Sequence, residues 1–86
     1  MYVIIVYDVN QRRVGRLCKY LRQYLNWVQN SVFEGFLTES QLARVRKGIL
    51  SRIKESDSVY IYKLPDDRWL DREIIGQMRM PTDAII

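Results

Sequence analysis

The sequence predicts an α+β fold in which two helices cover one face of a mostly antiparallel sheet. The 86 residues are enough for one domain, and 48% of them are hydrophobic, so a core can form. Short segments rich in β-branched and aromatic residues are separated by two longer segments with helical periodicity. These strands and helices do not alternate strictly, which argues against a parallel, doubly wound sheet.

The first predicted strand, residues 2–7, is apolar on both faces and is typical of a central strand. Asp8 follows it, and Asn10 is expected to cap a helix over residues 11–26. One face of this helix carries its apolar side chains, at Val14, Leu17, Cys18, Leu21, Tyr24 and Leu25.

Residues 27–37 alternate in polarity and are predicted to form the next strand, in which Gly35 indicates a bulge or a close approach. As one strand, this segment gives the order βαβαββ. A break near Asn30 gives a hairpin and the order βαββαβ, which is the ferredoxin-like arrangement. Both orders place the two helices on one face of the sheet.

The second half of the chain is predicted to contain one helix and two strands. Thr38 and Gln41 have the spacing of a capping box, which predicts a helix that ends near Lys54. Ser58–Leu64 is the next strand, and residues 72–76 are a weaker last strand.

The first strand has two apolar faces, but helices on one side of the sheet cover only one of them. An uncovered apolar face needs a partner. The apolar tail, residues 83–86, needs cover as well. We therefore expect a face-to-face homodimer in which residues 83–86 form an exchanged C-terminal strand, because a twofold dimer is the commonest closed oligomer.

The charge is unevenly distributed and indicates a polyanionic partner. Residues 1–54 contain ten Lys and Arg against three Asp and Glu, a balance of +7, whereas residues 55–86 contain four against seven, a balance of −3. Such a basic surface favours nucleic acid, with a solvated face that binds no ligand as the alternative. The longest apolar run is too short to span a membrane. The single Cys18, expected to be a small core residue, fits a reducing cytoplasm.

Carboxylates are the only plausible metal ligands in the sequence. Histidine is absent and Cys18 stands alone, which excludes histidine bases, histidine ligands and zinc sites built on paired cysteines. Oxygen ligands favour Mg²⁺ or Mn²⁺. The candidate ligand is Asp8, at the carboxyl end of the first strand. A twofold axis would supply a second Asp8, and a water on a shared metal ion could attack a phosphodiester.

Both polar residues at this strand end have a purely structural alternative. Asp8 could end the strand by accepting backbone N–H groups. Asn10 could support the site by orienting a water or a phosphate, or it could serve only as the helix cap.

Basic residues at the start of the first helix indicate an anion site. Acidic side chains are preferred in a first helical turn, and Arg12 and Arg13 depart from that preference at a cost of about 0.3–1 kcal/mol each. Exposed backbone N–H groups and guanidinium groups together suit a phosphate. Further basic residues follow on the outer face, so nucleic-acid binding is assigned to Arg12, Arg13, Arg16, Lys19 and Arg22.

The chain resembles the CRISPR-associated Cas-two (Cas2) family. The resemblance is carried by four segments, which occur in order across essentially the whole chain: YDV at residues 7–9, the arginines at 12–13, QNSVFEG at 29–35 and DSVYIY at 57–62. The QNSVFEG stretch after a YDV strand is the most specific of these.

This resemblance implies a ferredoxin-like fold and a symmetric dimer with exchanged C-terminal strands. It also implies a metal-dependent nuclease, acting on RNA or double-stranded DNA, with Asp8 as its catalytic and metal-binding residue. Members of the family act in spacer acquisition, where the dimer bridges the CRISPR integrase (Cas-one) subunits and basic residues hold the DNA duplex. By position, Arg12, Arg13 and Arg16 would contact phosphate.

The residues alone leave several functions open. One acidic residue per subunit and no general base make a scaffold role as well supported as an endoribonuclease or a DNase. A toxin-type ribonuclease of the virulence-associated kind looks similar in size and fold. A non-catalytic ferredoxin-like binding module would give the basic side chains no special role.

Overall fold

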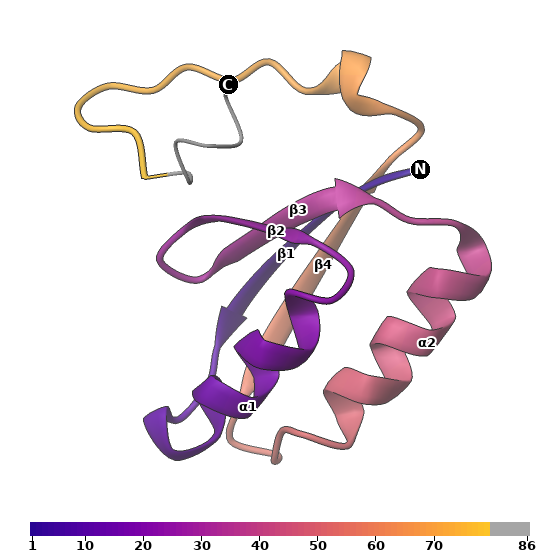
Figure 1. Cartoon of the computed structure of the whole chain (residues 1–86), viewed down its shortest axis with the longest axis vertical. Coiled ribbons are helices and arrows are strands. Elements are labelled where there is room, and N and C mark those ends of the chain that lie inside the picture. The colour runs from indigo at the N-terminus through magenta and orange to yellow at the C-terminus, as the bar shows by residue number, and fades with distance from the viewer. Residues whose placement is uncertain (80–86) are drawn as a thin grey trace.

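The computed structural model describes residues 1–79, which form a four-stranded antiparallel sheet with two helices packed on one side (Figure 1). The strands lie in the order β2-β3-β1-β4, so β1 is central and β2 and β4 are edges. The elements are β1 (Tyr2–Asp8), α1 (Gln11–Leu21), β2 (Asn26–Gln29), β3 (Val32–Phe36), α2 (Glu39–Leu50), β4 (Ser58–Leu64) and the 3₁₀ helix η1 (Asp67–Trp69). This order, βαββαβ, confirms the α+β, ferredoxin-like prediction.

Residues 27–37 break into a hairpin because Asn30 turns the chain. Asn30 has a φ of 26°, a left-handed conformation that asparagine tolerates better than most residues. Its carbonyl accepts hydrogen bonds from the Tyr7 hydroxyl and from Trp27 Nε1, both at 3.1 Å. The irregularity predicted at Gly35 lies in β2 instead, where the pairing register shifts after Trp27. Gly35 does make a close approach, since a Cβ there would stand 3.0 Å from Leu25 Cδ2.

The core lies between the helices and the sheet, and β1 divides its side chains between the two faces. Val3, Ile5 and Tyr7 are buried against the helices, whereas the alternate residues point to the opposite face. The rest of the buried cluster comes mainly from α1, β3 and α2, with Leu17, Leu21, Leu25, Phe33, Leu37, Leu42, Val45 and Ile49.

Both helices begin at their predicted caps. Asn10 Oδ1 accepts from the Arg12 N–H at 2.9 Å, and Thr38 and Gln41 form both hydrogen bonds of a capping box. These caps satisfy N–H groups that have no partner within the helix.

Both helices end earlier than predicted. α1 stops at Leu21 and not near residue 26, because the Tyr24 N–H bonds to the Leu21 carbonyl three residues back and starts a turn. This turn carries Leu25 into the core as part of the connection to β2. α2 stops at Leu50 and not near Lys54. The Arg52 N–H bonds to the Ile49 carbonyl, also three residues back, and starts a similar turn.

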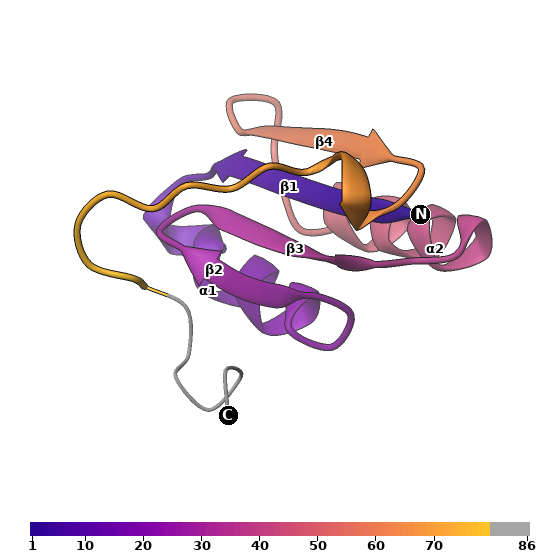
Figure 2. The ribbon, with the colours of Figure 1, turned by 90° about the horizontal axis from the view of Figure 1, so that it is seen from above.

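The predicted strand at residues 72–76 is wrong. After η1 the chain runs as irregular coil back over the face of the sheet that the helices leave open (Figure 2). Arg72 crosses this face to pair with the buried carboxylate of Glu34, and this side-chain contact replaces strand pairing. Residues 83–86, predicted to form an exchanged strand, lie outside the described residues. Within residues 1–79 neither helix has the length and apolarity that crossing a bilayer requires.

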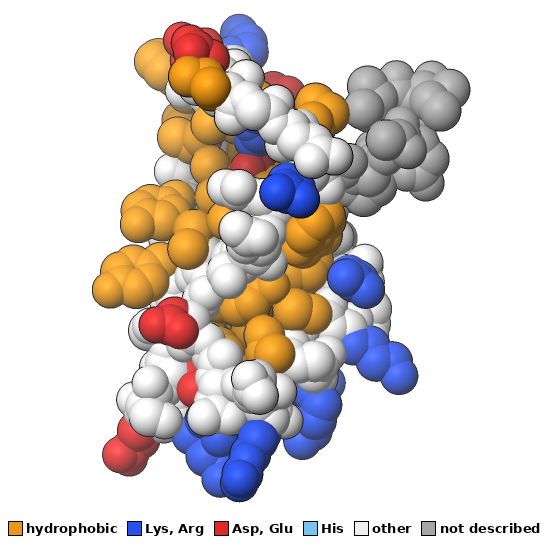
Figure 3. Space-filling view, turned by 90° about the vertical axis from the view of Figure 1, so that its left-hand side faces the viewer, with side chains coloured by type: hydrophobic (Ala, Val, Ile, Leu, Met, Phe, Trp, Pro, Cys, Tyr) orange, Lys and Arg blue, Asp and Glu red, His pale blue; other side chains and the backbone are white. Residues whose placement is uncertain are grey.

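The open face of the sheet is largely apolar (Figure 3). By strand alternation it carries Ile4 and Val6 of β1, with Phe36 from β3 and Tyr60 and Tyr62 from β4. The last three are 58%, 59% and 53% exposed. These large side chains therefore remain in contact with solvent in the single chain.

Candidate functional site

Asp8 is the last residue of the central strand, and its backbone is held by strand pairing. It stands opposite Ser58, the first residue of β4, and both side chains point toward the open face. Its side chain is exposed, and within residues 1–79 the carboxylate makes no hydrogen bond or ion pair. The alternative in which it accepts backbone N–H groups is therefore not seen in this part of the chain.

Asn10, two residues farther on, acts as the helix cap. Its side-chain oxygen is occupied by the Arg12 N–H. Its own backbone N–H donates to Asp57 Oδ1 at 3.0 Å, and its carbonyl accepts from the Arg13 N–H at 2.8 Å. The backbone N–H groups expected to bind an anion at this helix start are thus largely engaged already.

Arg13 forms a bidentate ion pair with Asp57, from the loop between α2 and β4. Its Nε lies 2.7 Å from Asp57 Oδ2, and its Nη2 lies 2.9 Å from Asp57 Oδ1. The Arg13 side chain is 20% exposed and that of Asp57 only 2%. The hydrogen bonds from Arg13, joined by backbone N–H groups, hold the pKa of Asp57 well below its usual range.

This ion pair explains how a helix tolerates arginines in its first turn. The first turn of α1 contains no acidic residue of its own. Asp57 brings a carboxylate to the same place from 44 residues away, where the helix dipole favours negative charge. Arg13 is therefore held within the fold, whereas the neighbouring Arg12 is exposed.

The other predicted nucleic-acid contacts are exposed, and Figure 3 shows Lys and Arg side chains gathered at the lower end of the molecule. Arg12, Arg16 and Lys19 follow one another at spacings of four and three residues, which places them on one stripe of α1. Arg22 is exposed as well but lies beyond the last helical residue, at the C-cap. Arg12, Arg16 and Lys19 are called the α1 stripe below.

No group of three or more carboxylate or cysteine side chains that could hold a metal ion occurs within residues 1–79. Within residues 1–79, Asp57 lies near this strand end but its carboxylate is taken up by Arg13 and backbone N–H groups. A metal site built on Asp8 therefore needs ligands from a second molecule or from the substrate.

Comparison with known proteins identifies the family. The family model for CRISPR associated protein Cas2 matches residues 1–72. The chain belongs to the Cas2 family.

Curated Cas2 relatives match the whole chain. A protein of Methanocaldococcus jannaschii named CRISPR-associated endoribonuclease Cas2 is 53% identical over 87 residues, which cover 100% of this chain and 76% of the relative. A protein of the same name from Methanothermobacter thermautotrophicus is 48% identical, with 100% and 96% covered.

Solved Cas2 structures share the fold. A crystal structure described as cas2 is 47% identical, with a TM-score of 0.87 over 94% of this chain and 92% of that one. Cas2 of Streptococcus pyogenes, crystallised at pH 6.5, is 30% identical, with a TM-score of 0.75 over 88% of this chain and 100% of that one.

Two buried carboxylates of this Cas2 chain were missed by the sequence analysis. Asp57 had only an indirect signal, the pair of arginines without acidic neighbours at the start of α1. Glu34 had none, although its side chain is 7% exposed and accepts from the Tyr2 hydroxyl and from Arg72. Glu34 and Arg72 also line a cleft of about 290 Å³ between the sheet and the chain that follows η1.

Proposed function

We propose that this Cas2 chain is a metal-dependent phosphodiesterase that works as a homodimer in CRISPR spacer acquisition. The observation that carries the proposal is the exposed Asp8 carboxylate, fixed at the end of the central strand next to the helix that bears the α1 stripe. The names of its relatives support cleavage of RNA, and double-stranded DNA is the alternative substrate.

The proposed metal ligand is Asp8 from each of two subunits. Carboxylate oxygens suit Mg²⁺ or Mn²⁺, and an exposed side chain without other partners is free to coordinate. When bound, the metal ion would supply a water of lowered pKa as the nucleophile and would neutralise charge on the phosphate. The chain's own contribution is to hold Asp8 at a rigid strand end and to place cations of the α1 stripe near the phosphates.

The proposed dimer uses the open face of the sheet. Phe36, Tyr60 and Tyr62 are each more than half exposed there, and burying such side chains is the main driving force for association. Asp8 points toward this face, so a face-to-face arrangement is the one that brings two copies of Asp8 toward each other. Residues 83–86 remain the proposed exchanged strand.

A non-catalytic scaffold is the second candidate function. It is favoured by the chemistry, since the described part of the chain offers one exposed carboxylate at the strand end and no cluster of metal ligands. In this role the dimer would bridge the integrase (Cas-one) subunits, and the α1 stripe would hold the duplex without cleaving it.

Substitution of Asp8 separates the two functions. Asp8→Ala should reduce Mg²⁺-dependent cleavage by about 100-fold or more, because a lost metal ligand removes several kcal/mol of transition-state stabilisation. Cleavage of single-stranded RNA and double-stranded DNA by the pure protein, with and without EDTA, measures the loss. Sedimentation should show the oligomeric state unchanged.

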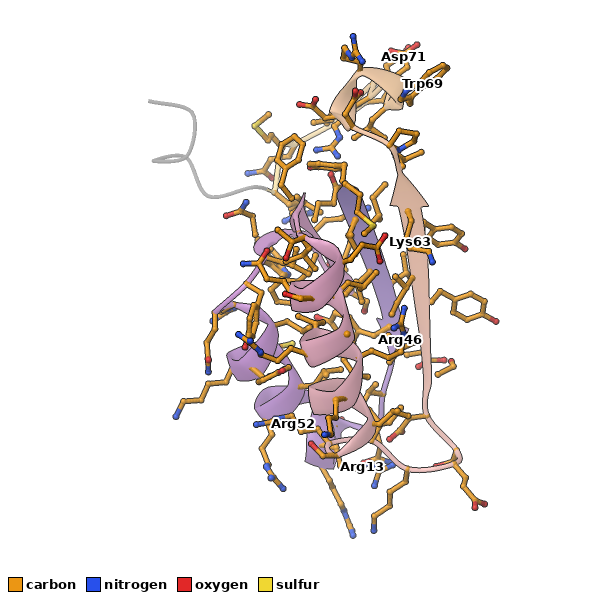
Figure 4. The ribbon with its side chains drawn as sticks, turned by 90° about the vertical axis from the view of Figure 1, so that its right-hand side faces the viewer. Arg13, Arg46, Arg52, Lys63, Trp69 and Asp71 are labelled. Carbon is orange, nitrogen blue, oxygen red and sulfur yellow. The ribbon has the colours of Figure 1, made fainter. Side chains whose placement is uncertain are left out.

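Asp71→Ala is the matched control. Asp71 is an exposed carboxylate at the end of the molecule opposite to Arg13 (Figure 4), and its removal should leave cleavage unchanged. Asp8→Ala protein that cleaves as fast as the wild type would exclude Asp8 as the catalytic residue and leave the scaffold role.

A further inference from the structure

We propose that Asp57 is a positioning residue for Asp8. Its buried carboxylate joins the backbone that follows Asp8, at Asn10, to the loop that leads into β4, the strand that pairs with Asp8. The inference rests on the proposed role of Asp8 and adds to it a residue that is distant in sequence and does not itself face the substrate.

The Asp57 carboxylate accepts four hydrogen bonds from three places in the chain. Arg13 donates two of them, at 2.7 and 2.9 Å. The Asn10 N–H donates a third at 3.0 Å, and the Lys54 N–H a fourth at 2.9 Å. A buried carboxylate with this many donors is strongly fixed, since hydrogen bonds to a charged group are about twice as strong as neutral ones.

These bonds close a small ring around Asp8. Along the chain, Asp8 is joined through Val9 to Asn10, whose N–H binds Asp57. Asp57 is joined in turn to Ser58, which pairs with Asp8 across the strands. The backbone of Asp8 is therefore held on both sides, on one side by β4 and on the other by the carboxylate of the residue that precedes β4.

A carboxylate is needed at position 57 because every group that faces it is a donor. Both of its oxygens accept, each from one side-chain and one backbone N–H. An asparagine has the same shape but only one accepting oxygen, so its NH₂ group would face donors. Those N–H groups would lose their partners, and the ring around Asp8 would loosen.

Asp66 is another carboxylate that accepts from an arginine side chain and from a backbone N–H, but it does not join distant parts of the chain. It accepts from Nε and Nη2 of Arg68 and from the Arg68 backbone N–H. That pair joins residues two apart within one turn. Its side chains are more exposed, 30% for Asp66 and 83% for Arg68. It adjoins η1, at the end of the molecule opposite to Arg13 (Figure 4), so Asp66→Asn is the matched control.

The test compares Asp57→Asn with Asp66→Asn in the full chain, at a temperature where both are folded. Amide hydrogen exchange of the metal-free protein should be about tenfold faster at Asn10 and Lys54 in Asp57→Asn only. Backbone ¹⁵N order parameters should fall at Asp8 and Val9. The Mn²⁺ dissociation constant, measured without substrate, should rise about tenfold or more, as for other residues that orient a ligand.

The outcomes separate this inference from the proposed function. If Asp57→Asn lowers only the melting temperature, and Mn²⁺ affinity and the order of Asp8 match those of Asp66→Asn, Asp57 is merely structural and the inference is overturned. If the wild type neither binds Mn²⁺ through Asp8 nor cleaves, the proposed function fails. Faster exchange at Asn10 and lower order at Asp8 in Asp57→Asn would then still show that Asp57 fixes the backbone of Asp8.

Arg13→Lys covers the case in which Asp57→Asn does not fold. It keeps the positive charge but replaces a bidentate contact by a single point of contact. The same three measurements should change in the same direction by a smaller factor. Unchanged exchange at Asn10 and unchanged Mn²⁺ affinity in this variant would overturn the inference as well.

Discussion

At the scale of single residues, burial and the carboxylate of Glu34 together keep Tyr2 neutral. The Tyr2 hydroxyl donates to Glu34 Oε1 at 2.9 Å, and Arg72 pairs with the same oxygen. Burial, together with this hydrogen bond to a carboxylate, raises the pKa of Tyr2 to about 12. A tyrosinate at this position would lose its hydrogen bond and face a negative charge.

The raised pKa predicts that stability falls in alkali. The ordinary pKa is 10.0, so the contribution of neutral Tyr2 is fully present below about pH 10 and is lost as the pH rises to about 12. Tyr2→Phe should therefore flatten the fall in unfolding free energy over this range and cost about 1 kcal/mol at neutral pH. Urea unfolding at several pH values measures both effects. Tyr62→Phe, an exposed tyrosine on the same face, is the control, and an unchanged slope in Tyr2→Phe would contradict the assignment.

Single residues were predictable where their partners are local. The caps at Asn10 and Thr38 depend on contacts within three residues, and both were found from the sequence. Asp57 and Glu34 pair with arginines 44 and 38 residues away, and only the fold brings them together. For the same reason the sequence could assign Arg13 to phosphate but could not reveal that Asp57 already holds it.

At the scale of elements, the basic residues of α1 have two different environments. Arg13 turns toward Asp57, whereas Arg12, Arg16 and Lys19 of the α1 stripe face solvent. The stripe is therefore the part of α1 that is available for phosphate groups.

Charge reversal of the α1 stripe tests this assignment. Arg12→Glu with Arg16→Glu should weaken binding of a DNA duplex by about 10- to 100-fold and lower the slope of log K against log salt by roughly 2, since each lost phosphate contact removes about 0.9. Fluorescence anisotropy at several salt concentrations measures both.

The control for the stripe is a charge reversal on α2, which matches each single α1 substitution, Arg12→Glu or Arg16→Glu, in its change of charge. Arg46 is exposed and lies toward β4 (Figure 4), so Arg46→Glu changes the net charge without touching α1. The affinity for the duplex is also measured for Arg12→Glu alone and Arg16→Glu alone. If Arg46→Glu loses as much affinity as either of these, net charge, and not the stripe, governs binding.

Elements with a strong sequence pattern were predictable, whereas the weak pattern at residues 72–76 led to a wrong prediction. The central strand follows from its continuous apolar run, and both helices follow from their periodicity, because the fold buries the residues that these patterns mark. The hairpin was one of two readings, and a single left-handed residue, Asn30, decided between them. Residues 72–76 include the β-branched pair Ile74 and Ile75, which favours a strand, but they form no strand, and Arg72 at their start pairs with Glu34.

At the scale of the whole molecule, the open face links the proposed dimer to the proposed chemistry. A stable interface buries about 800 Å² of each partner, and the single chain exposes 6523 Å² in all. The required patch is thus a modest part of the surface, and the open face supplies its large side chains. If Asp8 of each subunit holds one shared metal ion, neither subunit is active alone.

A mixing experiment tests this dependence directly. When wild type is mixed with an equal amount of Asp8→Ala and the subunits exchange fully, about a quarter of the dimers contain two intact Asp8 residues. A shared metal ion predicts that activity per total protein falls to about a quarter, whereas independent sites predict about a half. Tyr62→Lys, which places a charge on the open face, should weaken the dimer and remove activity at dilutions where the wild type is still dimeric. Activity at about half in the mixture, or full activity of a monomeric Tyr62→Lys, would mean that one Asp8 suffices and that the dimer serves binding alone.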